Sequence, residues 1–182
     1  GAGGRRGGAP APLVLKELIL AGNVIDNEGV RLLCQALHGP VGVNLSVLDL
    51  SGNSIKWEGA KAVARAMTLG MSKLERLVLS GNEIGDRGME AFAGVLAEQA
   101  AAAGDQLPTL RELDVAGCGI REDGVASLGE VLTYITSLKV IRLARNKICE
   151  PSTAGLSKLY GGLAATPCLE ELDLSGCGLG GR

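Results

Sequence analysis

The sequence has 182 residues, a formal net charge of −2, an apolar fraction of 46% and an aromatic fraction of only 2%. This composition predicts a globular chain whose core is filled by Leu, Val, Ile and Ala, and the charge excludes the strong field that draws proteins onto nucleic acid or anionic membranes. We therefore expect a protein partner, with no nucleic acid and no membrane.

The first residues, GAGGRRGGAPAP, are rich in Gly and Pro and contain no apolar stretch of the kind found in a secretory signal. We expect 1–12 to be a flexible tail and 13–182 to be a single domain. No apolar run reaches the roughly 18 residues that a transmembrane helix requires. The cysteines number five and include no CxxC pair, which favours reduced thiols and a cytoplasmic location.

A pattern of the form LxxLxLxx(N/C) then recurs along the chain. Its copies are LKELILAGN from Leu15, LSVLDLSGN from Leu45, LERLVLSGN from Leu74, LRELDVAGC from Leu110, LKVIRLARN from Leu138 and LEELDLSGC from Leu169. Their starts are separated by 30, 29, 36, 28 and 31 residues, and the long interval holds AEQAAAAGDQLPT, whose alanines favour an extended third helix before Gly104 and Asp105.

Each of the first five copies is followed by apolar or small residues spaced along one helix face, as at Leu33 and Leu37. One strand and one helix cannot bury their apolar faces alone, so the repetition predicts stacked parallel units.

The pattern resembles the leucine-rich repeat of the ribonuclease-inhibitor-like class, over residues 15–179. The resemblance implies an α/β solenoid, a right-handed horseshoe with parallel strands on the concave face and helices on the convex face. It implies five full repeats plus the start of a sixth. The sixth copy stops before a helix, which leaves end-to-end self-association open.

The resemblance also implies a module that binds a protein through the concave strand surface and adjoining turns. Activators of the Ran GTPase and nucleotide-binding immune receptors carry similar repeats. A Ran-GTPase-activator-like regulatory domain and a sensor or autoinhibitory array therefore remain alternatives.

The last position of the pattern forms a column that we call the turn ladder: Asn23, Asn53, Asn82, Cys118, Asn146 and Cys177. In the family, this side chain bonds the backbone of the turn that leaves the strand, so we expect a structural role. A feature present in every repeat favours scaffold over catalysis. The sequence contains no GxxxxGK, HExxH or GxSxG motif, and we expect no enzyme, no catalytic residue, no metal and no cofactor.

The third and fifth positions of the pattern are predicted to face the concave side, because side chains alternate along a strand. The candidate partner-binding residues in these columns are Asp49, Arg76, Val78, Asp114, Val140, Arg142 and Asp173. One interpretation is that Arg142 lies between Asp114 and Asp173 and that the charges neutralise one another. The other is that the residues form a mixed contact patch.

The only tryptophan, Trp57, is the remaining candidate. We place it in the turn entering the second helix, at the position held by Asn27, Arg87 and Asp123 in other repeats. Polar equivalents predict an exposed side chain, which would suit an interface anchor. The alternative is that Trp57 packs over its own repeat or on a neighbouring one.

Overall fold

The computed structural model describes residues 14–103, 109–149 and 152–179. The tail predicted for 1–12 and the helix break predicted at Gly104 and Asp105 lie outside these residues. Within them, short strands form one parallel sheet in chain order. Its strands are β1 (Glu17–Ile19), β2 (Val47–Asp49), β3 (Arg76–Val78), β4 (Glu112–Asp114), β5 (Val140–Arg142) and β6 (Glu171–Asp173).

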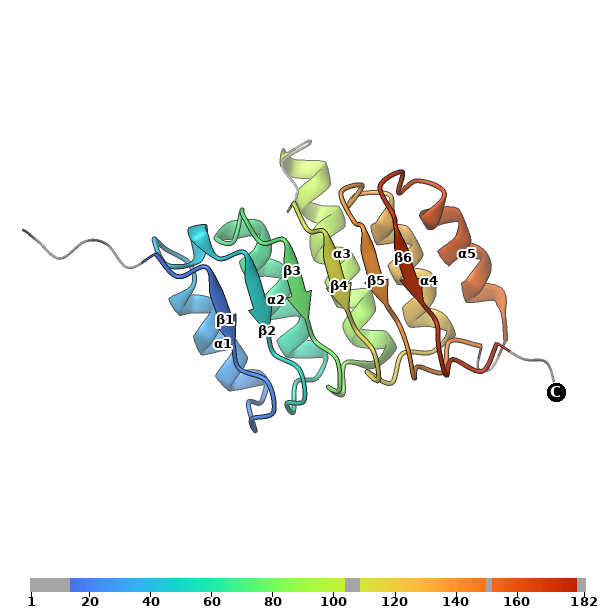
Figure 1. The fold of residues 1–182 in the computed structure, drawn as a ribbon, viewed down its shortest axis with the longest axis horizontal. Coiled ribbons are helices and arrows are strands. Elements are labelled where there is room, and N and C mark those ends of the chain that lie inside the picture. The colour runs from blue at the N-terminus through green and yellow to red at the C-terminus, as the bar shows by residue number, and fades with distance from the viewer. Residues whose placement is uncertain (1–13, 104–108, 150–151, 180–182) are drawn as a thin grey trace, which may run out of the picture.

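The helices alternate with the strands and all lie on one face of the sheet, which leaves the other face open (Figure 1). Their bounds are α1 (Asn27–Ala36), α2 (Trp57–Leu69), α3 (Gly85–Ala103), α4 (Glu122–Leu132) and α5 (Ala154–Leu163), with a short 3-10 turn at Gly42–Asn44. The predicted α/β solenoid is confirmed. The third helix runs to Ala103, as its alanines predict.

The strands pair without offset, so equivalent positions of successive repeats lie side by side. Leu48 of β2 pairs with Leu18 of β1 and Leu77 of β3, and both Leu48 and Leu77 are fully buried. The helices supply the opposite wall of the core, which includes the single phenylalanine, Phe92. Burying the central residue of each strand leaves the residues on either side of it facing away from the helices.

The N-termini of two helices are each capped by a side chain of the preceding repeat. The Oδ1 atom of Asn27 accepts hydrogen bonds from the backbone N–H groups of Lys56 and Gly59 at the start of α2, at 2.8 and 3.1 Å. Similarly, the Oδ1 atom of Asp86 accepts from Arg121 and Gly124 at the start of α4, at 2.7 and 2.9 Å. Because these bonds satisfy donors that a helix leaves free, they join the repeats on the helix side.

Candidate interaction surface

The turn ladder joins consecutive repeats through hydrogen bonds to the backbone. The Nδ2 atom of Asn53 donates to the carbonyls of Leu50 in its own repeat and Leu20 in the preceding one, at 2.9 and 3.0 Å. Its Oδ1 atom accepts from the N–H of Ile25 at 3.1 Å. With a further bond from Nδ2 to the carbonyl of Ser51, Asn53 contacts four backbone groups in two repeats, which is a structural arrangement.

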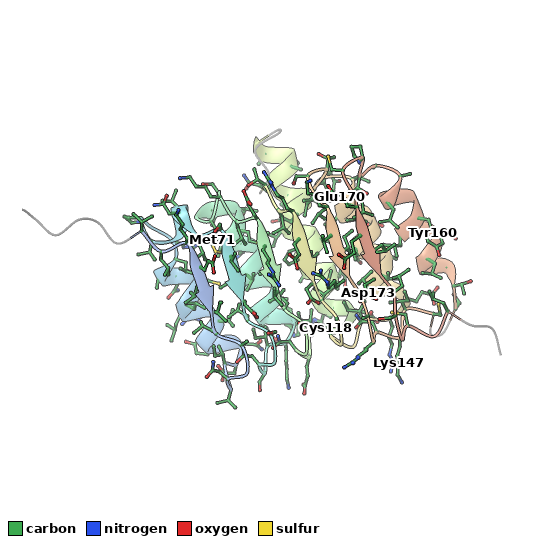
Figure 2. The ribbon with its side chains drawn as sticks, in the orientation of Figure 1. Met71, Cys118, Lys147, Tyr160, Glu170 and Asp173 are labelled. Atoms are coloured by element: carbon green, nitrogen blue, oxygen red, sulfur yellow. The ribbon has the colours of Figure 1, made fainter. Side chains whose placement is uncertain are left out.

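The same contacts recur at Asn82 and Asn146, both of which are buried. Cys118 lies in the turn that leaves β4 (Figure 2), and its Sγ donates to the carbonyl of Leu79 at 3.2 Å. Cys177 makes the equivalent contact with Leu143 at 3.1 Å. Burial raises the pKa of the Cys118 thiol to about 12, so this thiol stays protonated at neutral pH and is a poor nucleophile or metal ligand. At the start of the array, the exposed Asn23 donates to Leu20 and Ala21 of its own repeat.

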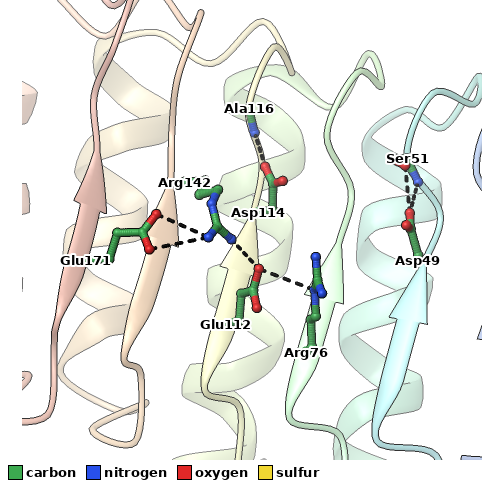
Figure 3. A network of polar contacts seen from close by, with 8 residues as sticks. All are labelled: Asp49, Ser51, Arg76, Glu112, Asp114, Ala116, Arg142 and Glu171. Carbon is green, nitrogen blue, oxygen red and sulfur yellow. Dashed lines mark hydrogen bonds and ion pairs between the residues drawn. The ribbon is translucent and has the colours of Figure 1, made fainter. Parts of the chain in front are cut away.

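The open face of the sheet, which we call the strand face, carries a chain of ion pairs (Figure 3). Arg142 of β5 donates to Glu112 of β4 and lies 3.1 Å from Glu171 of β6. On its other side, Glu112 pairs with Arg76 of β3 at 3.3 Å. These side chains join four consecutive strands, with Val140 between the two glutamates in the register.

This network corrects the expectation that Arg142 is neutralised between Asp114 and Asp173. Although the register does place Arg142 between them, each aspartate bonds its own turn. The Oδ1 atom of Asp114 accepts from the N–H of Ala116 at 3.0 Å, and that of Asp173 from Ser175 at 2.9 Å. An aspartate side chain is short enough to bond the backbone two residues on, whereas glutamate reaches the diagonal neighbour on the next strand.

Asp49 does the same at the end of β2, where its Oδ1 atom accepts from the N–H and the hydroxyl of Ser51. At Asp173, the hydrogen bonds from Ser175 hold the pKa of the carboxyl below its usual value, and the charge of Arg142 makes a smaller contribution. At neutral pH Asp173 is therefore an anion on the strand face.

The environment of Arg142 keeps it charged as well. Its partial burial alone would lower the pKa, but the hydrogen bond to Glu112 and the charges of Glu112, Glu171 and Asp114 outweigh burial, and the pKa is raised.

The valines of the strand face differ in what they offer to a partner. Val140 is half-buried, whereas Val78 is only 5% exposed. Val78 lies between Asp49 and Asp114 in the register. It therefore presents little surface, and the expectation that Val78 contributes to a contact patch is wrong in this respect.

Trp57 is neither in a turn nor exposed. It is the first residue of α2 and is half-buried, and the guanidinium carbon of Arg87 lies 3.7 Å from the centroid of its ring. Counting from the preceding isoleucine of each repeat, its equivalents are Asn27, Asp86 and Glu122, which bond the start of a following helix. An indole has no acceptor for such a bond, and Trp57 instead stacks with Arg87 on the helix side.

A shallow depression of about 530 Å³ lies where the strands end. Its floor consists of Gly, Ala and Ser, and Asp114, Arg145 and Asp173 stand around it. Arg145 occupies the position that is glycine in the other repeats. Its φ of 59° lies in the left-handed region, and no other non-glycine residue in the described part of the chain has a positive φ. The depression is open space next to charged groups.

The candidate residues thus separate into two regions. Asp49, Arg76, Asp114, Val140, Arg142 and Asp173 share the strand face, whereas Trp57 is on the helix side. Sequence reasoning missed Glu112 and Glu171 as the partners of Arg142. Their longer side chains were the available signal, since they occupy the third-position column next to Val140.

Comparison with known proteins gives one family. The family model described as Leucine Rich repeat matches residues 13–34, 43–64, 70–93, 106–129 and 166–182. The ribonuclease inhibitors of Sus scrofa and Mus musculus are 34% and 32% identical to the chain over 161 residues, which are 88% of this chain and 33% of each relative. The chain therefore spans about a third of the length of these relatives.

A human protein described as NACHT, LRR and PYD domains-containing protein 12 is 27% identical over 88% of this chain and 17% of its own length. Among the helices of the described residues, none combines the length and apolar character needed to cross a membrane. Residues 14–103, 109–149 and 152–179 also contain no group of three or more His, Cys, Asp or Glu placed to hold a metal ion.

Proposed function

The chain belongs to the leucine-rich repeat family, and on this premise we propose that it is a non-catalytic protein-interaction module whose strand face binds a partner protein. The observation that supports this proposal is the excess of acidic groups on that face. Its third and fifth positions hold six carboxylates and two guanidiniums: Glu17, Asp49, Glu112, Asp114, Glu171 and Asp173 against Arg76 and Arg142.

This balance indicates the chemistry of the partner. Both arginines already pair with carboxylates of the same face, and the remaining acids face solvent or the small-residue depression. A partner surface with Lys and Arg side chains would complement them, and complementary charge favours fast association and the choice of partner. Bonds from the turns hold Asp49, Asp114 and Asp173 in place before a partner arrives, so little side-chain entropy is lost on binding.

The experiment that tests the proposal captures partners from extract at low salt with wild type and three variants. Asp173→Lys reverses one charge of the strand face, and Arg142→Glu removes the cation that links Glu112 and Glu171. Glu28→Lys is the control, because Glu28 lies on α1, where it pairs with Arg31 in an exposed contact. A protein recovered with wild type and Glu28→Lys, lost from Asp173→Lys, and retained by Arg142→Glu, whose face is more acidic still, supports the proposal. Equal recovery with all forms, with unchanged circular dichroism, would sink it.

We further propose a cytoplasmic location. All five cysteines, which lie within the described ranges, are free thiols, and Cys168 is exposed. Such thiols are typical of a reducing compartment.

A second candidate function is a repeat array of a larger receptor. The similarity to the NACHT, LRR and PYD domains-containing protein favours this candidate, since the chain matches a segment of that protein's length. A nucleotide-binding domain encoded in the same transcript would support it, and a transcript that encodes repeats alone would rule it out.

Self-association through the last repeat is a separate proposal. Leu179 is 48% exposed there, and Leu172 and Leu174 of β6 and its turn are only half-buried. Sedimentation should show a dimer that Leu179→Lys dissociates. A monomer over the same concentrations would contradict end-to-end packing.

A further inference from the structure

Two depressions flank α3 on the helix side, away from the strand face. One, of about 320 Å³, lies between α2 and α3 and includes Trp57 and Arg87 in its lining. The other, of about 400 Å³, lies between α3 and α4 and includes Glu130 and Tyr134. Glu90 and Gly94 of α3 line both depressions, so the two meet across the helix. We call the pair the α3 furrow.

Gly94 lies where the two halves of the furrow meet, and the fold does not require a glycine there. A glycine inside a helix costs about 1 kcal/mol relative to alanine. At Gly129 and Gly162 that cost has a structural reason, because a Cβ at either position would collide with backbone of the neighbouring helix. At Gly94, by contrast, a Cβ would meet no described atom within 4 Å. The open space above Gly94 is available to something outside the chain.

The half of the furrow between α3 and α4 has the chemistry of a site for a basic side chain. Its charged lining residues are Glu90 and Glu130, and its aromatic residue, Tyr134, is 40% exposed. In the described ranges Glu90 has no ion-pair partner, and Glu130 makes a single exposed contact, to Lys158 at 3.2 Å. Ala97, which is half-buried, provides apolar surface for the stem of a lysine or arginine, whose charged end would then meet carboxylates and an aromatic ring.

The half between α2 and α3 supplies an aromatic contact, and its charged lining is balanced, with Lys61 and Arg87 against Glu90 and Glu98. Trp57 is half-buried there, and one face of its ring is covered by Arg87. Tryptophan, tyrosine and arginine are the residues that most often dominate the energy of protein interfaces. The chain has only four aromatic residues, and two of them line the furrow.

We propose that the α3 furrow is a second interaction surface, which binds a basic peptide segment of a partner protein. The segment crosses α3 above Gly94, places a Lys or Arg side chain between Glu90 and Glu130, and packs against Trp57 in the other half. This surface lies on the opposite side of the sheet from the strand face, so the inference does not rest on the function proposed above.

The test uses the intact chain and the emission of Trp57, which is the only tryptophan and therefore reports on the furrow directly. The probes are two synthetic amphipathic helical peptides without tryptophan, identical except that one carries Lys and the other Glu on its polar face. We expect the Lys peptide to cause a saturable change in Trp57 emission. Its affinity should be at least about tenfold higher than that of the Glu peptide and should fall as salt is added.

Paired glycine variants separate the furrow from other acidic surfaces. Gly94→Leu fills the junction of the two halves and should lower the affinity for the Lys peptide at least about tenfold. Gly161→Leu is the matched control, because Gly161 is an exposed glycine of α5 whose Cβ would also meet no described atom within 4 Å, and it should bind like wild type. Glu90→Gln should weaken binding several-fold, whereas Asp173→Lys on the strand face should leave the Trp57 signal intact.

Three results would overturn the inference. They are a Lys peptide that causes no saturable change, equal effects of the two peptides, and full binding by Gly94→Leu. A Trp57 emission that depends on protein concentration without peptide would instead assign the furrow to a second copy of the chain.

Discussion

Arg142 of β5 bonds Glu112 of β4, although Asp114 is the β4 residue that pairs with it in the sheet. The guanidinium thus reaches diagonally past its direct neighbour and also pairs with Glu171 of β6. Arg142 therefore links three strands on a surface where carboxylates outnumber guanidiniums.

Removal of this link should cost little stability, because Arg142 is 31% exposed and exposed ion pairs contribute weakly. We expect Arg142→Ala to lower the free energy of unfolding by about 1 kcal/mol. Arg76→Ala, which removes one pair from a more exposed arginine, should cost about half as much. Urea unfolding measures both. A loss at Arg142 no greater than at Arg76 would show that the bond to Glu171 contributes nothing.

The turn ladder should contribute far more to stability than the ion pairs of Arg142. Asn82→Ala leaves the carbonyls of Leu50 and Leu79 and the N–H of Ile55 without their side-chain partner in a buried turn. We expect this change to cost about 2 to 4 kcal/mol, since unsatisfied buried groups carry their full desolvation penalty. Asn23→Ala is the control, because Asn23 is exposed and bonds only its own repeat, and its cost should stay below about 1 kcal/mol. Similar costs at both positions would contradict a ladder that gains strength from neighbouring repeats.

Arg145 should be a position at which the chain can be stabilised. Its φ of 59° is costly for a residue with a Cβ, whereas the equivalent Gly117 and Gly176 adopt this conformation freely. Arg145→Gly should raise the free energy of unfolding by about 1 kcal/mol after the entropy of glycine is counted. Arg145→Ala keeps the strained backbone and should give no gain. A gain with alanine equal to that with glycine would attribute the effect to the side chain.

The buried thiols predict a loss of stability at alkaline pH. Burial raises the pKa of Cys34 and of Cys118 from an ordinary value of 9.0 to about 12, so the folded chain holds these protons after the unfolded chain has released them. The stabilising effect of the protonated thiols is fully present below pH 9 and is lost as the pH rises toward 12. Across this pH range, the free energy of unfolding should fall more steeply for wild type than for Cys34→Ala/Cys118→Ala. If the free energies of unfolding of the two proteins changed in parallel with pH, the raised pKa values of Cys34 and Cys118 would be contradicted.

The repeat, the strand register and the columns of the strand face could all be predicted from the sequence. They depend on the spacing of leucines such as Leu48 and Leu77, because burial of these residues fixes which neighbours turn outward. Which charges pair could not be predicted from the columns alone. It depends on side-chain length, and it is decided by competition between the turn N–H groups and Arg142 for Asp114 and Asp173.

The environment of Trp57 could not be predicted from the sequence pattern either. The equivalents predicted for it include Arg87 and Asp123, whereas Asp86 and Glu122 occupy the matching position. The bonds that Asn27 and Asp86 accept from later helices join residues 29 to 38 positions apart. Such a bond is visible only when the repeats are stacked. Once it is seen, the loss of an acceptor at Trp57 explains why this residue stacks on Arg87.

The most direct test of the strand face as a recognition surface is the salt-dependent affinity of the captured partner for wild type, Asp173→Lys and Glu28→Lys. The charges of the face predict that wild type and Glu28→Lys bind equally, that added salt weakens both, and that Asp173→Lys binds at least about tenfold more weakly at low salt. Equal affinity of all three forms, unchanged by salt, would contradict recognition through the strand face.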